Sequence, residues 1–185
     1  VRSFVLVLED GSKVRLTFSR FLSRSHPHIG IQKVRIENLS SKELHFSLSF
    51  ALENNVIHWG KDCYWTRENE IVYNGKETAI SANTLTSHQK LFARCVLSSS
   101  KEVPFEASTS SRRSESKTEF DLKTKEVIGF EKGCAFEIDK KGTKSFTELE
   151  KESEEDISVI KEKGYEGLLK ENCSFWGKFF QENDI

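Results

Sequence analysis

The sequence predicts a mainly β protein: an antiparallel β-sandwich followed by a pair of C-terminal helices. Apolar residues alternate strictly with smaller or polar ones from Leu44 to Leu52, which is typical of a strand with one face in a core. Turn signals recur at intervals of about ten residues up to residue 140, a spacing that favours eight or nine short antiparallel strands in a sandwich. Beyond residue 146 the apolar residues adopt helical spacing.

Other strands are predicted by the same alternation and by the turns between them. Residues 13–19 alternate after Asp10-Gly11, and a second hairpin signal, Asn74-Gly75, follows another apolar run. The stretch 98–118 is rich in serine, threonine and charged residues, which indicates a solvated loop or the tip of a long hairpin. Further strands are expected at 28–38, 70–73, 91–98, 117–122 and 133–139.

Two helices are expected at the C-terminal end. Ser153 precedes three acidic residues and predicts a capping box at the start of the first helix. Gly164 is placed to end it. The second helix, from about 165 to 181, carries one apolar stripe that requires a partner surface. The stripe consists of Tyr165, Leu168, Leu169, Cys173, Trp176 and Phe180.

Composition restricts the classes of partner. The chain has 185 residues and 14 Phe, enough for one domain with a packed core. The net charge is −1, so neither nucleic acid nor an anionic membrane is expected as a partner. No apolar run has the roughly 18 residues that a transmembrane helix needs. The four cysteines, at 63, 95, 134 and 173, lack Cys-x-x-Cys spacing; we expect buried free thiols and a cytoplasmic location.

The sequence contains no recognisable catalytic set. Phosphate-binding, dinucleotide-binding and Gly-x-Ser-x-Gly motifs are missing. No carboxylate is isolated in apolar surroundings, as the general acid of a glycosidase would be. His26-Pro27-His28 lacks the ligand spacing of a metal site. We therefore expect no catalytic residue, no metal and no organic cofactor in this chain.

One segment could lie near a carbohydrate. Residues 54–65 combine large aromatic and polar side chains outside a clean strand pattern. Indole rings stack on sugar rings, and amide or imidazole groups can hydrogen-bond sugar hydroxyls. The candidates are Asn55, His58, Trp59 and Trp65. Packing of the two tryptophans in the core or at a domain interface is the alternative.

The C-terminal segment resembles a known family. The pattern that starts at Gly164-Tyr165 and continues through Leu168-Leu169 and Trp176 to Asp184-Ile185 is similar to the helix that leaves the N-terminal β-sandwich of glycoside hydrolase family 65. That family includes maltose, trehalose, kojibiose and nigerose phosphorylases. Residues 18–40 are similar to central strands of the same domain. The resemblance implies a supersandwich-like domain over 1–145 and a helical linker segment over 146–185, leading toward an (α/α)6 catalytic barrel that this chain does not contain.

The resemblance also implies a function for the intact enzyme. A homodimeric parent would cleave an α-linked glucosyl disaccharide with inorganic phosphate as co-substrate, or with water if it is a hydrolase. The general acid of that enzyme would be a glutamate in the barrel, and no organic cofactor would take part. This chain would be inactive by itself, would dock on the barrel through Tyr165, Leu168, Leu169, Trp176 and Phe180, and would supply oligomer contacts.

The alternative is a freestanding β-sandwich that binds carbohydrate or another protein, because a fold alone does not fix a function. The apolar stripe discriminates between the two. A freestanding module should bury Trp176 within itself, whereas a domain of a larger enzyme should leave it exposed.

Overall fold

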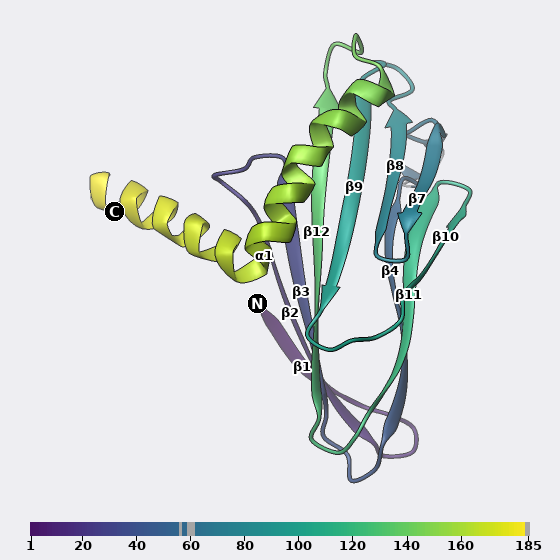
Figure 1. Cartoon of the computed structure of the whole chain (residues 1–185), viewed down its shortest axis with the longest axis vertical. Helices are drawn as coiled ribbons and strands as arrows, with labels where there is room; N and C mark the ends of the chain where they lie inside the picture. The colour runs from purple at the N-terminus through teal and green to yellow at the C-terminus, as the bar shows by residue number, and fades with distance from the viewer. Residues whose placement is uncertain (56, 59–61, 184–185) are drawn as a thin grey trace.

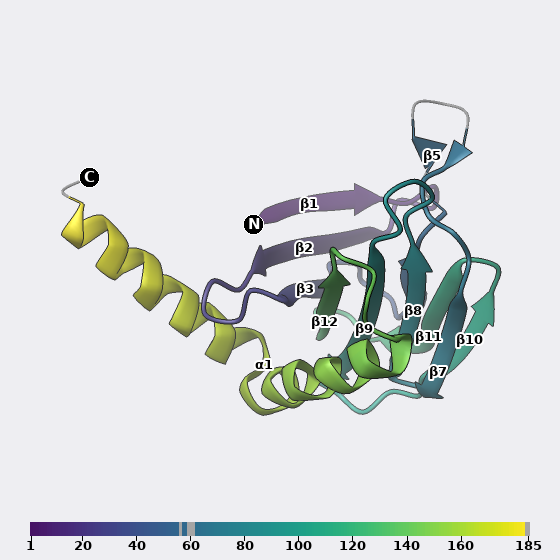
Figure 2. The ribbon, with the colours of Figure 1, turned by 90° about the horizontal axis from the view of Figure 1, so that it is seen from above.

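Two antiparallel β-sheets pack face to face, and one long helix crosses the outer face of the larger sheet (Figure 1). The computed structural model describes residues 1–55, 57–58 and 62–183. The predicted mainly β class and antiparallel sandwich are confirmed. Seen from above, the helix lies against the sheet over its first part and then leaves it (Figure 2).

All neighbouring strands are antiparallel. The described residues form a seven-stranded sheet in the order β1 (Arg2–Val7), β2 (Lys13–Leu22), β3 (Ile29–Asn38), β12 (Val127–Asp139), β9 (Lys90–Ser99), β8 (Glu77–Asn83) and β7 (Asn69–Asn74). The smaller sheet has the order β10 (Glu106–Ser110), β11 (Arg113–Leu122) and β4 (Leu44–Glu53). A short hairpin joins β5 (Ile57–His58) to β6 (Asp62–Cys63).

The turn signals mark real hairpins. Asp10-Gly11 lies between β1 and β2, where Gly11 has a φ of 79° that favours glycine. Asn74-Gly75 lies between β7 and β8. The polar stretch 98–118 holds β10 and the first half of β11, so it is a hairpin rather than a loop, and the strand expected at 117–122 begins earlier, at Arg113.

The main core fills the space between the two sheets. Leu44 and Phe50 of β4 are buried there, as the period-two pattern predicts. Across the β4–β11 pair, Phe46 stacks on Phe120 with ring centroids 5.4 Å apart. Phe130 of β12, with none of its surface exposed, contacts the Phe120 ring from the larger sheet. These aromatic contacts hold the sheets together.

Helix α1 (Phe146–Glu182) begins earlier than predicted. Ser145 is its N-cap, and Ser145 and Glu148 form a reciprocal capping box. The predicted start at Ser153 is wrong: Ser153 is fully buried inside the helix and its hydroxyl donates to the carbonyl of Glu150. The helix extends back because Leu149 is buried against β8 and β9. Among the described residues, no helix combines the length and apolarity that crossing a bilayer needs.

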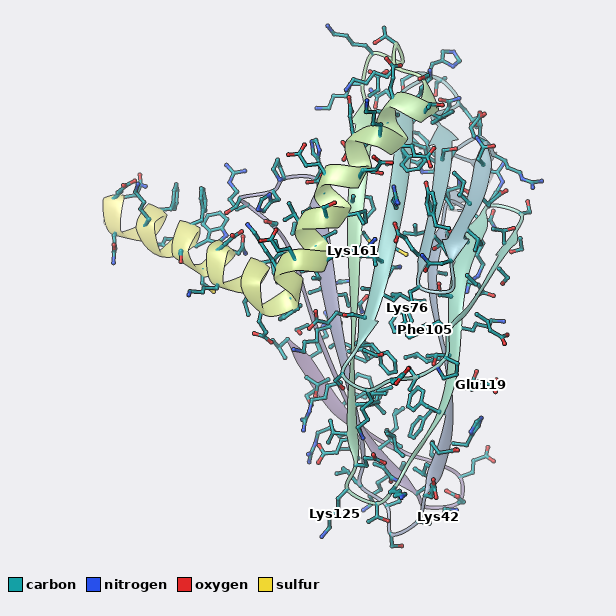
Figure 3. The ribbon with its side chains drawn as sticks, in the orientation of Figure 1. Lys42, Lys76, Phe105, Glu119, Lys125 and Lys161 are labelled. Carbon is teal, nitrogen blue, oxygen red and sulfur yellow. The ribbon has the colours of Figure 1, made fainter. Side chains whose placement is uncertain are left out.

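The first segment of α1 lies very close to the sheet. Ile160 packs over Gly133 of β12, where a Cβ atom would come within 2.3 Å of the Ile160 Cγ2 atom. The next residue, Lys161, donates to the buried Glu77 carboxylate at 2.7 Å. Lys161 lies on the helix where it passes the sheet (Figure 3), and Arg94 donates to the other Glu77 oxygen. This part of α1 is therefore integral to the sandwich.

Replacing Ser145 by alanine should lower the free energy of unfolding by about 1 kcal/mol, because the Glu148 N–H loses its capping acceptor. Urea unfolding measures the change. Ser158→Ala is the matched control, since the exposed Ser158 hydroxyl only bonds back to the Glu154 carbonyl within the same helix. Equal stabilities of the two variants would contradict the capping role.

Candidate functional site

Gly164 divides α1 into two segments that point in different directions (Figure 1). Its φ of 58° and ψ of −169° are not helical and lie in a region that favours glycine. The predicted break at Gly164 is thus present, but as a kink inside one helix rather than as a gap between two helices. The Tyr165 N–H, at the start of the second segment, donates to the Glu131 carboxylate at 2.9 Å. That carboxylate takes the role of a cap.

A lysine on β3 ties the kink to the sheet. Lys33 Nζ lies 2.7 Å from the Glu166 carboxylate and 3.4 Å from that of Glu131. The hydrogen bond to Glu166 raises the pKa of Lys33. Its ammonium also lies over the Tyr165 ring, 5.3 Å from the centroid. The charge of Glu131 is therefore balanced where it caps the helix.

The turn between β2 and β3 holds the second segment from the side. Tyr165 packs edge-on against Phe21 at 5.3 Å between centroids, and Leu168 is fully buried. Further along, Asn172 Oδ1 accepts the Arg24 N–H at 3.0 Å. Glu171 pairs with His26 at 3.2 Å and with Lys163. A surface groove of about 750 Å³ runs between this turn and the helix.

Toward its C-terminal end, α1 has no strand or other helix beside it in either view (Figures 1 and 2). Four aromatic side chains lie there, between 36% and 46% exposed. They contact one another, with Trp176 at the centre and ring centroids 5.4 to 5.9 Å apart. Arg24 lies over one of the rings, 5.3 Å from its centroid. We call this set the aromatic face: Phe175, Trp176, Phe179 and Phe180.

The predicted apolar stripe therefore splits in two. Tyr165 and Leu168 are buried in this domain and Leu169 packs against the same cluster, while Trp176 and Phe180 are exposed. The split occurs because the turn between β2 and β3 reaches only as far as Phe175 along the helix.

The cysteines follow the expectation only in part. Cys95 and Cys134 are buried free thiols, as predicted, and lie directly opposite each other on β9 and β12. Cys173 is exposed, so the prediction of burial is wrong for this residue, which lies on the second segment of α1.

The segment expected to approach a carbohydrate is only partly described. Trp59 lies outside the described residues, and of His58 the structure describes the backbone, paired with Asp62. Asn55 is exposed after β4, and Trp65 is half-buried, edge-on to Tyr64 at 5.6 Å. The Trp65 carbonyl accepts a hydrogen bond from Arg112. Because only Asn55 and Trp65 have described side chains, the carbohydrate-proximal role of the four residues stays a prediction.

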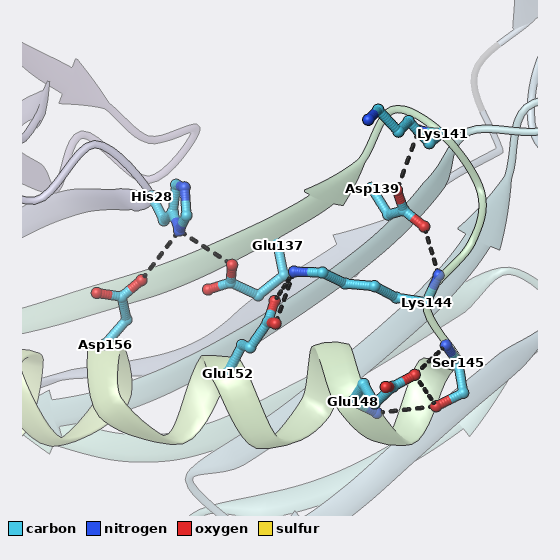
Figure 4. Close-up of polar contacts among 9 residues, drawn as sticks. All are labelled: His28, Glu137, Asp139, Lys141, Lys144, Ser145, Glu148, Glu152 and Asp156. Atoms are coloured by element: carbon cyan, nitrogen blue, oxygen red, sulfur yellow. Dashed lines mark hydrogen bonds and ion pairs between the residues drawn. The ribbon is translucent and has the colours of Figure 1, made fainter.

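Sequence reasoning missed one cluster of ligand-type side chains. His28, Glu137 and Asp156 meet between the sheet and α1 (Figure 4). Burial, reinforced by the charge of Asp156 and opposed by His28, raises the pKa of Glu137 to about 7. Three separate parts of the chain supply these residues, so no local spacing in the sequence reveals the cluster.

Gly164→Ala should destabilise the chain by about 1–3 kcal/mol, because alanine strongly disfavours this φ and ψ and its Cβ would lie 3.3 Å from the Glu131 carboxylate. Gly177→Ala is the matched control. Gly177 lies in the outer segment with nothing within 4 Å of a Cβ, so alanine there should be neutral or slightly stabilising. Urea unfolding of both variants checks this; similar effects would contradict the role of the kink.

Comparisons with known proteins identify the family. The sequence gives no match among curated proteins. A solved protein from the human microbiome, described as a kojibiose phosphorylase, shares the fold with a TM-score of 0.88 over 97% of this chain at 21% identity. This chain spans 23% of that one. Residues 1–179 match the family described as "Glycosyl hydrolase family 65, N-terminal domain". The chain therefore belongs to glycoside hydrolase family 65, as its N-terminal domain.

Proposed function

We propose that this chain is the non-catalytic β-sandwich of a glycoside phosphorylase or hydrolase that acts on α-linked glucosyl disaccharides. Its role is to pack on a catalytic (α/α)6 barrel and to contribute oligomer contacts. A phosphorylase would use inorganic phosphate as co-substrate, and the reacting groups would lie in the barrel. Membership of the family and the likeness to a solved phosphorylase support the class of enzyme.

One observation carries the docking role: the aromatic face is exposed on a helix whose base is fixed. Isolated apolar side chains on a surface are common, but a contiguous aromatic patch usually marks a contact site. Trp176 is 40% exposed and Phe180 46%. A freestanding module would be expected to cover such rings with its own residues. The exposure favours a domain of a larger enzyme.

A second surface suits oligomer contacts. β1 is an edge strand of the large sheet, and all six of its residues are exposed. Its exposed side chains include Phe4, Val5, Leu6 and Val7. Arg2 is the one charged residue of this strand and proline is missing from it, and an exposed apolar edge of this kind is normally paired or covered. We assign the predicted homodimer contact to this edge.

The carbohydrate role of the 54–65 segment remains a secondary proposal. The exposure of Asn55 and the partial exposure of Trp65 leave both side chains able to contact a ligand at that edge. In the intact enzyme, the segment would approach the mouth of the barrel together with His58 and Trp59.

Trp176 should be protected from iodide quenching in the intact enzyme and accessible in the 185-residue chain, because the barrel would cover the aromatic face. The Trp176 contribution is measured in each protein as the difference in emission from its Trp176→Phe variant. Trp176→Ala should also lower the stability of the intact enzyme more than Lys178→Ala does, a control on the same exposed segment. Equal quenching of Trp176 in both proteins would contradict the docking role.

The 185-residue chain should show no phosphate-dependent cleavage of maltose, trehalose, kojibiose or nigerose, since we find no catalytic set in it. Release of glucose 1-phosphate measures the activity, with the intact enzyme as the positive control. Titration with the same sugars, followed by tryptophan fluorescence, tests the alternative module. Turnover by the chain would contradict the proposal, and saturable binding lost in Trp65→Ala would favour the carbohydrate-binding alternative.

A further inference from the structure

Three side chains with metal-ligand chemistry converge on the outer face of the large sheet. His28 lies just before β3, Glu137 on β12 and Asp156 on the first segment of α1. One donor atom from each lies within 4.8 Å of the other two. His28 Nδ1 is 3.0 Å from Glu137 Oε2 and 3.6 Å from Asp156 Oδ2 (Figure 4). The Phe136 N–H donates to the His28 carbonyl at 2.9 Å, which fixes the histidine relative to β12.

Glu137 is the member of the cluster that points to a ligand. Its side chain is 4% exposed, and its Oε1 atom is buried with no hydrogen-bond partner among the described residues. A buried carboxylate oxygen without a donor or cation costs free energy. The Lys144 ammonium donates to Glu152 at 2.6 Å rather than to Glu137. Two carboxylates, Glu137 and Asp156, thus share one imidazole.

We propose that His28, Glu137 and Asp156 bind a zinc-type divalent cation, through His28 Nδ1, one oxygen of Asp156 and the Glu137 carboxylate. Tetrahedral zinc with ligands at about 2.1 Å separates its ligand atoms by about 3.4 Å, which the two measured distances bracket. One nitrogen and two oxygen ligands suit zinc better than calcium or magnesium, which take oxygen ligands. Because His28 is 55% exposed, water can reach the fourth position.

The ion would join three segments that are distant in the sequence: the turn before β3, β12 and α1. It would neutralise the buried carboxylate and release any proton that Glu137 holds. Binding to the folded chain alone would raise the midpoint of thermal unfolding with zinc concentration. The site lies on the segment of α1 before Gly164, so it strengthens the part of the helix that supports the aromatic face.

Metal is first removed from the chain with a chelator, and the chelator is then removed. The chain is titrated with zinc chloride by calorimetry at pH 7.5. The titration uses a Cys173→Ser background, because Cys173 is an exposed thiol. We expect one zinc ion per chain and a higher midpoint of thermal unfolding. Glu137→Gln and His28→Gln should each lower the zinc affinity about 100-fold. Loss of a residue that only supports a ligand costs about 10- to 100-fold, and loss of a ligand itself should cost at least the upper value. Cobalt in place of zinc should give visible absorption bands that the same variants lose.

His45 provides the control. Its Nδ1 atom lies 2.9 Å from Asp121 and its Nε2 atom 4.0 Å from Glu119, but all three side chains are exposed on the small sheet. Asp121→Asn should therefore leave zinc affinity unchanged. Because His28 is more than half exposed, His28→Gln tests the site without disturbing the core, which circular dichroism verifies. Absence of zinc binding, or unchanged zinc affinity in Glu137→Gln and His28→Gln, would overturn the proposal. The three side chains would then share a proton rather than a metal ion.

Discussion

The path of the C-terminal helix depends on one hydrogen bond, from the Tyr165 N–H to the Glu131 carboxylate. A helical segment that starts anew after a kink has free N–H groups and a positive dipole end, and a carboxylate satisfies both. Gly164 allows the change of direction, because its positive φ favours a residue without a Cβ. Lys33 balances the charge of Glu131. Since Glu131 and Lys33 are strand residues, the sheet itself sets the angle at which the second segment leaves.

The rest of the molecule makes that angle rigid. The aromatic core, with Phe130 at its centre, fixes β12, and Gly133 on the same strand lets Ile160 pack at very short range. The Glu77 carboxylate, buried between Arg94 and Lys161, adds a charged anchor on β8. Such a buried group stabilises the interface only while both cations remain in place. A rigid sandwich that ends in an exposed aromatic helix is suited to holding another domain at a fixed orientation.

The sequence allowed the fold to be predicted where the periodicity is local. The alternation around Leu44 and Phe50 and the Asp10-Gly11 turn identify strands and hairpins without any knowledge of their partners. The start of α1 was misplaced because two serines precede acidic residues, and only the burial of Leu149 against β8 and β9 shows that Ser145 is the true cap. A capping motif is local, but the choice between two such motifs depends on tertiary packing.

The candidate sites show the same limit. Helical spacing groups Tyr165 with Trp176 on one stripe, yet which of them is covered depends on the turn that carries Arg24. His28 and Glu137 come together only through strand pairing between β3 and β12, and Asp156 joins them from the helix. The spacing of these three residues in the sequence does not predict that they lie close together. Long-range pairing therefore decides both the proposed docking surface and the proposed metal site.

Hydrogen exchange along α1 tests the central claim most directly. In the 185-residue chain, amides of the first segment and of residues 165–172 should exchange slowly, because the sheet and the turn hold them. Amides from 173 to 182 should exchange fast, since an unpacked helical end opens readily, and they should become protected in the intact enzyme. Slow exchange throughout α1 in the isolated chain would contradict the claim that the aromatic face awaits another domain.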